Sequence, residues 1–226
     1  CLYFSKMKIQ ALTLYTSQLE TQLSFYKDTL GFQILESTES SFTLSIGRSQ
    51  LQFIKSKNTT PYHFAFNIPA NQEDAALSWL EQRVNIFKYG ELEIIDFEDW
   101  QAKAVYFYDA CNNLVEFISR RRIQSEVPEP FTIDSVLSIS EIGLVTDEIE
   151  AVYQKLNSTG IEIFDGNMHR FCAAGDDHGL FIIINPTVKN WFPTGEKAYY
   201  SPFEVDIEVE EKRHRLQYTK NSFQFQ

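Results

Sequence analysis

Apolar and polar residues follow two different periods in the first quarter of the chain. Residues 8–16 alternate between two faces, which is typical of a β-strand. In residues 18–30, apolar side chains recur every three or four positions, as on the buried face of a helix, and Gly31 follows where a helix stop is expected. Alternating runs then predict three short strands, over residues 32–35, 41–46 and 50–54.

The same order of elements returns along the chain. A strand over residues 62–68 precedes a helical pattern around residues 71–80, and two strands follow, over residues 104–108 and 114–119. A third copy has a strand at 138–145, a helix from Ile149 to Leu156, and strands at 161–164, 169–173 and 180–185. Residues 191–226 suggest a reduced fourth copy without its helix. This internal repeat predicts an α+β fold in which paired units bury their sheet faces and form curved sheets around a cavity.

The linker signals divide the chain into expected segments. Residues 1–7 look like a leader or a cloning remnant, because the periodic pattern starts only at Met7. We expect a two-unit domain over residues 8–122, a linker over 123–135 that is rich in charge and proline, and the remaining units over 136–226. The run Arg120–Arg122 could meet an anionic ligand, but we interpret it as the charged edge of that linker.

Charge and cysteine content narrow the function classes. The 226 residues carry a formal net charge of −11, which disfavours binding to nucleic acid or to an anionic membrane surface. No apolar run approaches the roughly 20 residues that span a bilayer. The 3 cysteines are widely spaced and form no C-x-x-C pair, so a disulfide framework is not expected and a reducing cytoplasm is.

Three stretches resemble the vicinal oxygen chelate superfamily, which includes glyoxalase I, bleomycin- and fosfomycin-resistance proteins and extradiol dioxygenases. Residues 25–32 (FYKDTLGF) are similar to the end of its first helix, and residues 106–118 (YFYDACNNLVEFI) to its closing hairpin. Residues 142–145 with 175–179 resemble a further module. The resemblance implies modules of one strand, a helix and three strands, which form half-barrels around a divalent metal ion.

The resemblance also implies metal-ligand positions on the first and last strands of each module. In the first two units these positions are Ala11, Gln52, His63 and Glu116, of which the last three can coordinate. An imidazole, a carboxylate and an amide oxygen suit Zn²⁺, Mn²⁺, Fe²⁺ or Ni²⁺. Because Ala11 cannot bind metal, the cofactor is either held by the remaining ligands or absent.

The third unit has Glu141 and Ile182 at the equivalent positions. Ile182 cannot coordinate, so no second complete metal site is expected there. The motif around His178 is interpreted as a tight turn that contains Gly179.

Two functions remain open at this stage. The first is a metal-dependent enzyme for a small molecule with vicinal oxygens, either a lyase or isomerase of the glyoxalase type or a ring-cleaving dioxygenase, with Glu116 as ligand and proton carrier. The second is a metal-free protein that binds or sequesters a small molecule. We expect a monomer or homodimer whose cavity is lined by Ala11, Tyr15, Phe66 and Tyr106.

For each ligand candidate a structural interpretation competes with the functional one. His63 could be a buried histidine that hydrogen-bonds a neighbour, Glu116 could face solvent by simple alternation, and Gln52 could be an ordinary polar strand residue.

Overall fold

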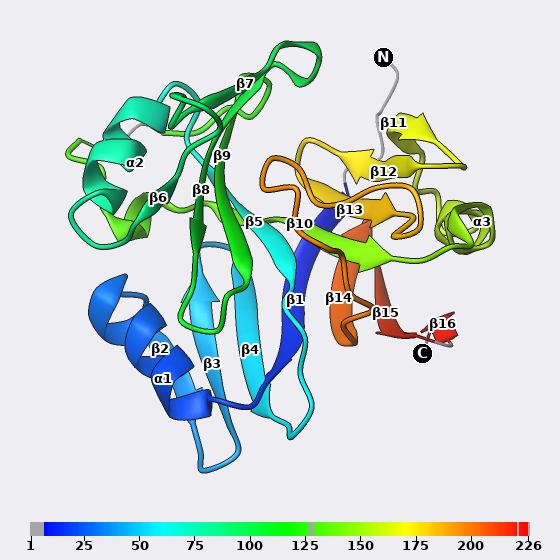
Figure 1. Ribbon diagram of the computed structural model, residues 1–226, viewed down its shortest axis with the longest axis horizontal. Coiled ribbons are helices and arrows are strands. Elements are labelled where there is room, and N and C mark those ends of the chain that lie inside the picture. The colour runs from blue at the N-terminus through cyan, green and yellow to red at the C-terminus, as the bar shows by residue number, and fades with distance from the viewer. Residues whose placement is uncertain (1–6, 127–128, 221, 226) are drawn as a thin grey trace.

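The repeated units are confirmed in the structure, a computed structural model that describes residues 7–126, 129–220 and 222–225 (Figure 1). The first unit comprises β1 (Met7–Thr16), α1 (Leu19–Ser24) with the π-helical turn η1 (Phe25–Thr29), β2 (Ile34–Ser37), β3 (Ser41–Ile46) and β4 (Ser49–Lys55). The second comprises β5 (His63–Ile68), α2 (Glu73–Leu80), β6 (Ile86–Phe87), β7 (Ile95–Phe97), the 3₁₀ turn η2 (Glu98–Trp100), β8 (Ala102–Tyr108) and β9 (Leu114–Arg120).

A short 3₁₀ turn, η3 (Ile133–Ser135), leads into the third unit. That unit comprises β10 (Ser138–Val145), α3 (Ile149–Asn157), β11 (Ile163–Asn167), β12 (Phe171–Asp176) and β13 (Gly179–Ile184). The last three strands, β14 (Phe203–Val209), β15 (Lys212–Thr219) and β16 (Ser222–Phe225), form a fourth unit that has no helix within the described residues.

The strands form two open, curved sheets, and each sheet combines strands from two of the units. The first sheet has the strand order β16-β15-β14-β1-β4-β3-β2, so it joins the first and fourth units. The second sheet has the order β11-β12-β13-β10-β5-β9-β8-β6, with β7 also paired to β8, so it joins the second and third units. The joining pairs, β1 with β14 and β5 with β10, are both antiparallel. The predicted α+β class with curved sheets is confirmed.

The expected segment boundaries can be located on this architecture. Met7, the last residue of the predicted leader, is buried and begins β1, while residues 1–6 lie outside the described residues. Each sheet takes strands from both 8–122 and 136–226, the ranges predicted as domains. The predicted linker connects β9 to β10, and two of its apolar side chains, Ile123 and Phe131, are buried.

One hydrophobic core lies between the two sheets and extends under the helices. On β5, alternation sends Phe64 and Phe66 into this core, while His63 and Ala65 face the opposite side. Burying a phenylalanine contributes about 1.5–3 kcal/mol, so the aromatic face of β5 fixes which way the strand is turned. The other face of the second sheet is concave and has its own smaller apolar cluster.

No helix in the described part of the chain is long and apolar enough to cross a membrane. Cys111 and Cys172 are both free thiols, and Cys1 lies outside the described residues.

Candidate metal centre and cavity

The concave face of the second sheet forms the floor of a cavity of about 510 Å³. Side chains of β5, β8, β9, β10 and β13 make the floor, and two segments outside these strands, residues 96–100 and 189–192, contribute to the walls. A volume of this size is within the range of small-molecule sites, which are usually apolar with a few polar groups.

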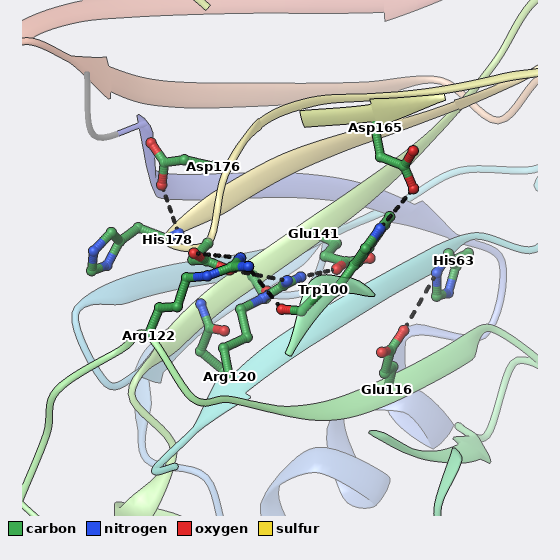
Figure 2. Close-up of polar contacts among 12 residues, drawn as sticks. His63, Trp100, Glu116, Arg120, Arg122, Glu141, Asp165, Asp176 and His178 are labelled. Carbon is green, nitrogen blue, oxygen red and sulfur yellow. Dashed lines mark hydrogen bonds and ion pairs between the residues drawn. The ribbon is translucent and has the colours of Figure 1, made fainter. Parts of the chain in front are cut away.

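Four strand positions meet on the cavity floor. They are His63 at the start of β5, Glu116 in the middle of β9, Glu141 on β10 and Ile182 on β13. The first three are buried, and one ligand atom from each lies within 4.8 Å of the others. Figure 2 shows His63 facing Glu116, and their Nε2 and Oε2 atoms are 3.7 Å apart. Two acids and an imidazole from three strands thus form a compact polar group.

A β-bulge turns Glu141 toward the cavity. The pairing of β10 with β5 shifts register between Ile139 and Glu141, and the extra residue lets both Ile139 and Ile142 face the core. Two polar residues, one of them Glu141, therefore lie between the two core residues, where regular alternation would place a single residue. The same shift occurs in β1 between Ile9 and Ala11, so Ala11 is the counterpart of Glu141 in the first sheet.

The imidazole of His63 is held in one orientation. Its Nδ1 lies 3.1 Å from the backbone carbonyl oxygen of Leu114, and a carbonyl can only accept, so Nδ1 carries the proton. Burial lowers the pKa of His63 to about 4, so the ring is neutral at pH 7. Nε2 is therefore left with a free lone pair facing the cavity, which is the state that a metal ligand requires.

Glu116 is the most strongly perturbed acid of the site. Burial and the nearby charge of Glu141 raise its pKa well above the ordinary value, and the hydrogen bond from Tyr106 and the charge of Arg120 only partly oppose this. Glu116 therefore tends to hold a proton when no cation is close to it.

This pKa shift predicts that Glu116→Gln changes the free energy of unfolding by an amount that depends on pH, when a chelator keeps the site free of metal. A carboxyl whose pKa is raised on folding costs stability as pH rises above its unfolded value of about 4.5, and glutamine removes that cost. We expect the variant to gain stability over wild type between pH 5 and pH 8, as measured by urea unfolding. A difference that stays constant with pH would contradict the assignment.

Glu141 is compensated from the far side by a buried cation. Arg120, at the end of β9, is fully buried, and its Nη2 donates to Oε1 of Glu141. Its Nη1 lies 3.7 Å from Oδ1 of Asp177, and its guanidinium lies 5.6 Å from the ring of Trp100. The interpretation of the run as a charged linker edge is therefore wrong for Arg120, which is the last residue of β9, whereas Arg122 is 42% exposed and lies beyond the strand.

Two tryptophans that the sequence did not single out form part of the cavity lining. Trp191 lies 5.0 Å from the ring of His63, and a Cβ at Gly143 would come within 2.6 Å of the Trp191 ring, so glycine is needed there. Trp100 donates from Nε1 to Asp165 over 2.7 Å, which ties residues 96–100 to β11 (Figure 2). The glycine on a buried strand was the available signal for Trp191.

The structure does not bring Gln52 to the metal group. Gln52 lies on β4 in the first sheet, where its amide contacts the hydroxyls of Thr13 and Thr43 at 3.4 and 3.3 Å. The expectation that the first and second units share one site is thereby corrected. The second unit shares its sheet with the third, and Glu141 occupies the position expected of a first-unit ligand.

Only one of the four predicted cavity residues, Tyr106, lines this cavity. Ala11 and Tyr15 lie on β1 in the first sheet, and the Tyr15 hydroxyl donates to Glu204 over 3.0 Å. Phe66 is fully buried in the core between the sheets, because it is three residues from His63 and so points to the opposite face of β5.

Comparisons with known proteins agree with this architecture. Residues 8–209 match the family model of the Glyoxalase/Bleomycin resistance protein/Dioxygenase superfamily, and the chain belongs to that superfamily. No curated protein matches the chain by sequence.

Solved structures show the fold. One is a protein from Bacillus subtilis subsp. subtilis str. 168, provisionally described as a dioxygenase, with TM-score 0.59 and 15% identity over 79% of this chain and 64% of that chain. Another is the V278E mutant of glyoxalase I from Zea mays, with TM-score 0.54 and 13% identity over 91% of this chain and 75% of that chain. The chain thus spans less than two thirds of the Bacillus protein.

The residues on the cavity floor fit a divalent metal ion. Three protein ligands with one position left open is the usual arrangement of a catalytic site, and Ile182 occupies the fourth strand position without a donor atom. Each ligand also has an outer partner: Leu114 for His63, Tyr106 for Glu116 and Arg120 for Glu141. Such partners orient metal ligands in known sites.

Proposed function

We propose that the protein is a metal-dependent enzyme of the glyoxalase or ring-cleaving dioxygenase type that acts on a small molecule in the cavity of the second sheet. The observation that carries this proposal is the meeting of His63, Glu116 and Glu141 within 4.8 Å on the cavity floor. Imidazole and carboxylate donors suit Zn²⁺, Mn²⁺, Fe²⁺ or Ni²⁺. A bound ion of this kind supplies a Lewis acid for the vicinal oxygens of a substrate.

The chain's own groups then have distinct tasks. The neutral imidazole of His63 and the two carboxylates would hold the ion, while Trp191 packs against His63 and would limit water at the site. We propose Glu116 both as a ligand and as the proton carrier toward a bound molecule, because it is the acid nearest to His63 on the cavity floor.

A second candidate function, binding without metal, is favoured by a different observation. Arg120 already compensates the charge of Glu141, and the cavity has several aromatic walls. A site of this kind can bind an apolar molecule without catalysing a reaction.

The experiment that separates the two candidates measures metal directly. The protein is purified without chelator, its metal content per chain is determined, and the stripped protein is titrated with Zn²⁺, Ni²⁺ and Mn²⁺. We expect about one site per chain, with affinity at least about tenfold weaker in His63→Ala, because the ligand set loses its imidazole. The matched control is His169→Ala, which removes an exposed imidazole and leaves affinity unchanged.

Absence of metal binding in the wild-type protein, together with tight binding of an aromatic molecule, would support the second candidate instead. If His63→Ala and His169→Ala bind metal equally well, the ligand assignment is wrong.

All three ligand groups come from one chain, so we propose that a monomer is sufficient for the site, whether or not the protein also forms a homodimer. We also propose a cytoplasmic location, which the free thiols of Cys111 and Cys172 support.

A further inference from the structure

The walls of the cavity carry a strong excess of acids. Asp96 lines it from β7, Glu98 and Asp99 line it from the turn η2, and Asp165 lines it from β11. Among the described residues that line the cavity, Lys189 is the only lysine or arginine. These four carboxylates belong to exposed residues that line the cavity, so their field acts on a charged molecule that enters it.

Two of these acids have no compensating partner in the described part of the chain. Glu98 and Asp99 form no ion pair there, whereas Asp96 lies 3.8 Å from Lys103 and Asp165 accepts the hydrogen bond of Trp100. Lys103 is itself shared with Glu73 at 3.7 Å. The segment from residue 96 to 99 therefore keeps most of its negative charge.

Aromatic faces lie directly beside this charge. Phe97 stacks on Trp100 with ring centroids 6.0 Å apart and meets Phe192 edge to face at 5.9 Å, and all three line the cavity. At the other wall, Nζ of Lys189 lies 4.1 Å over the ring of Phe171, so the cavity already holds one cation on an aromatic face. Aromatic faces attract cations through the ring quadrupole.

We infer that the cavity selects a flat, apolar molecule that carries a positive charge, such as an aromatic or quaternary amine, and that it disfavours anions. The cationic end lies at Phe97, Trp100 and Phe192 beside Asp96, Glu98 and Asp99. This inference rests on the proposed function, because it takes the same cavity as the small-molecule site, and it adds the charge class of the ligand.

The test compares three probes with the same two-ring skeleton: the 1-methylquinolinium cation, neutral quinoline at pH 8, and the 1-naphthoate anion. Calorimetric titration at low salt is expected to show the cation binding at least about tenfold more tightly than the anion, with quinoline between them. The difference should shrink in 0.3 M salt, where the Debye length falls to roughly 6 Å.

A matched pair of triple variants locates the effect. Asp96→Asn, Glu98→Gln and Asp99→Asn together should reduce the preference for the cation at least about threefold. The control combines Glu20→Gln, Glu36→Gln and Glu39→Gln, which removes the same number of exposed charges from the first unit and should leave the preference unchanged. Phe97→Leu keeps an apolar side chain but removes the aromatic face, and it should weaken binding of the cation by about threefold.

The outcomes distinguish this inference from the proposed function. Equal or tighter binding of 1-naphthoate, or equal effects of the two triple variants, would overturn the inference and leave the metal site untouched. Failure of all three probes to bind would overturn both the inference and the role of the cavity. Metal titration of the cavity triple variant should match wild type, since its substitutions are outside the metal group, and a loss there would contradict the separation of the two sites.

Discussion

Replacing Arg120 with methionine is expected to lower the free energy of unfolding by about 3–5 kcal/mol. Arg120 is fully buried, and its guanidinium pairs with the buried Glu141. Methionine fills part of the volume but leaves the buried carboxylate of Glu141 without its compensating cation. The loss therefore comes mainly from the stranded charge, and not from the attraction that the pair supplies.

Urea unfolding at pH 7 measures this effect, with Arg122→Met as the control. Arg122 is 42% exposed and lies 3.5 Å from Asp177, so its removal should cost less than about 1 kcal/mol. The double variant Arg120→Met with Glu141→Leu should recover most of the loss, because both charges are then gone. Equal destabilisation by the two single arginine variants would refute the argument.

Glu141→Gln is expected to weaken divalent metal binding by about 100-fold or more. Removal of an outer partner of a metal ligand typically costs 10–100-fold, and removal of an anionic ligand should cost at least as much as the top of that range. Gln52→Ala, the substitution at the ligand position predicted in the first unit, should leave the affinity unchanged because Gln52 lies in the other sheet.

Calorimetric titration of the stripped variants with Zn²⁺ or Ni²⁺ checks this prediction. Glutamine keeps a carbonyl oxygen that can accept from Arg120, and a thermal melt of Glu141→Gln verifies that the variant is folded. Loss of metal binding in Gln52→Ala, with normal binding in Glu141→Gln, would place the site in the first sheet.

Local pattern was sufficient to predict most of the elements. The strands over 41–46 and 138–145 agree with β3 and β10, because alternation and turn residues are local properties. The stretch between α2 and β8 showed no clear pattern, and it contains the short strands β6 and β7 and the turn η2. The strands β6 and β7 are stabilised by pairing with β8 and not by their own sequence.

The pairing of the units could not be predicted in this way. The repeat indicates equivalent strand positions in each unit, but which units share a sheet is decided by contacts between β5 and β10, far apart in sequence. Two errors were nevertheless avoidable. Alternation along β9 places Arg120 on the same face as Glu116, and alternation along β5 places Phe66 opposite His63.

The joining of the first and fourth units has a consequence for biosynthesis. β1 pairs with β14, so Met7 lies opposite Val209. During translation the second and third units can associate as soon as β13 has left the ribosome, whereas β1 must wait with one edge open for nearly the whole chain to be made. We expect the first sheet to be completed late and slowly, and an unpaired β1 to be the stage most exposed to aggregation or chaperone binding.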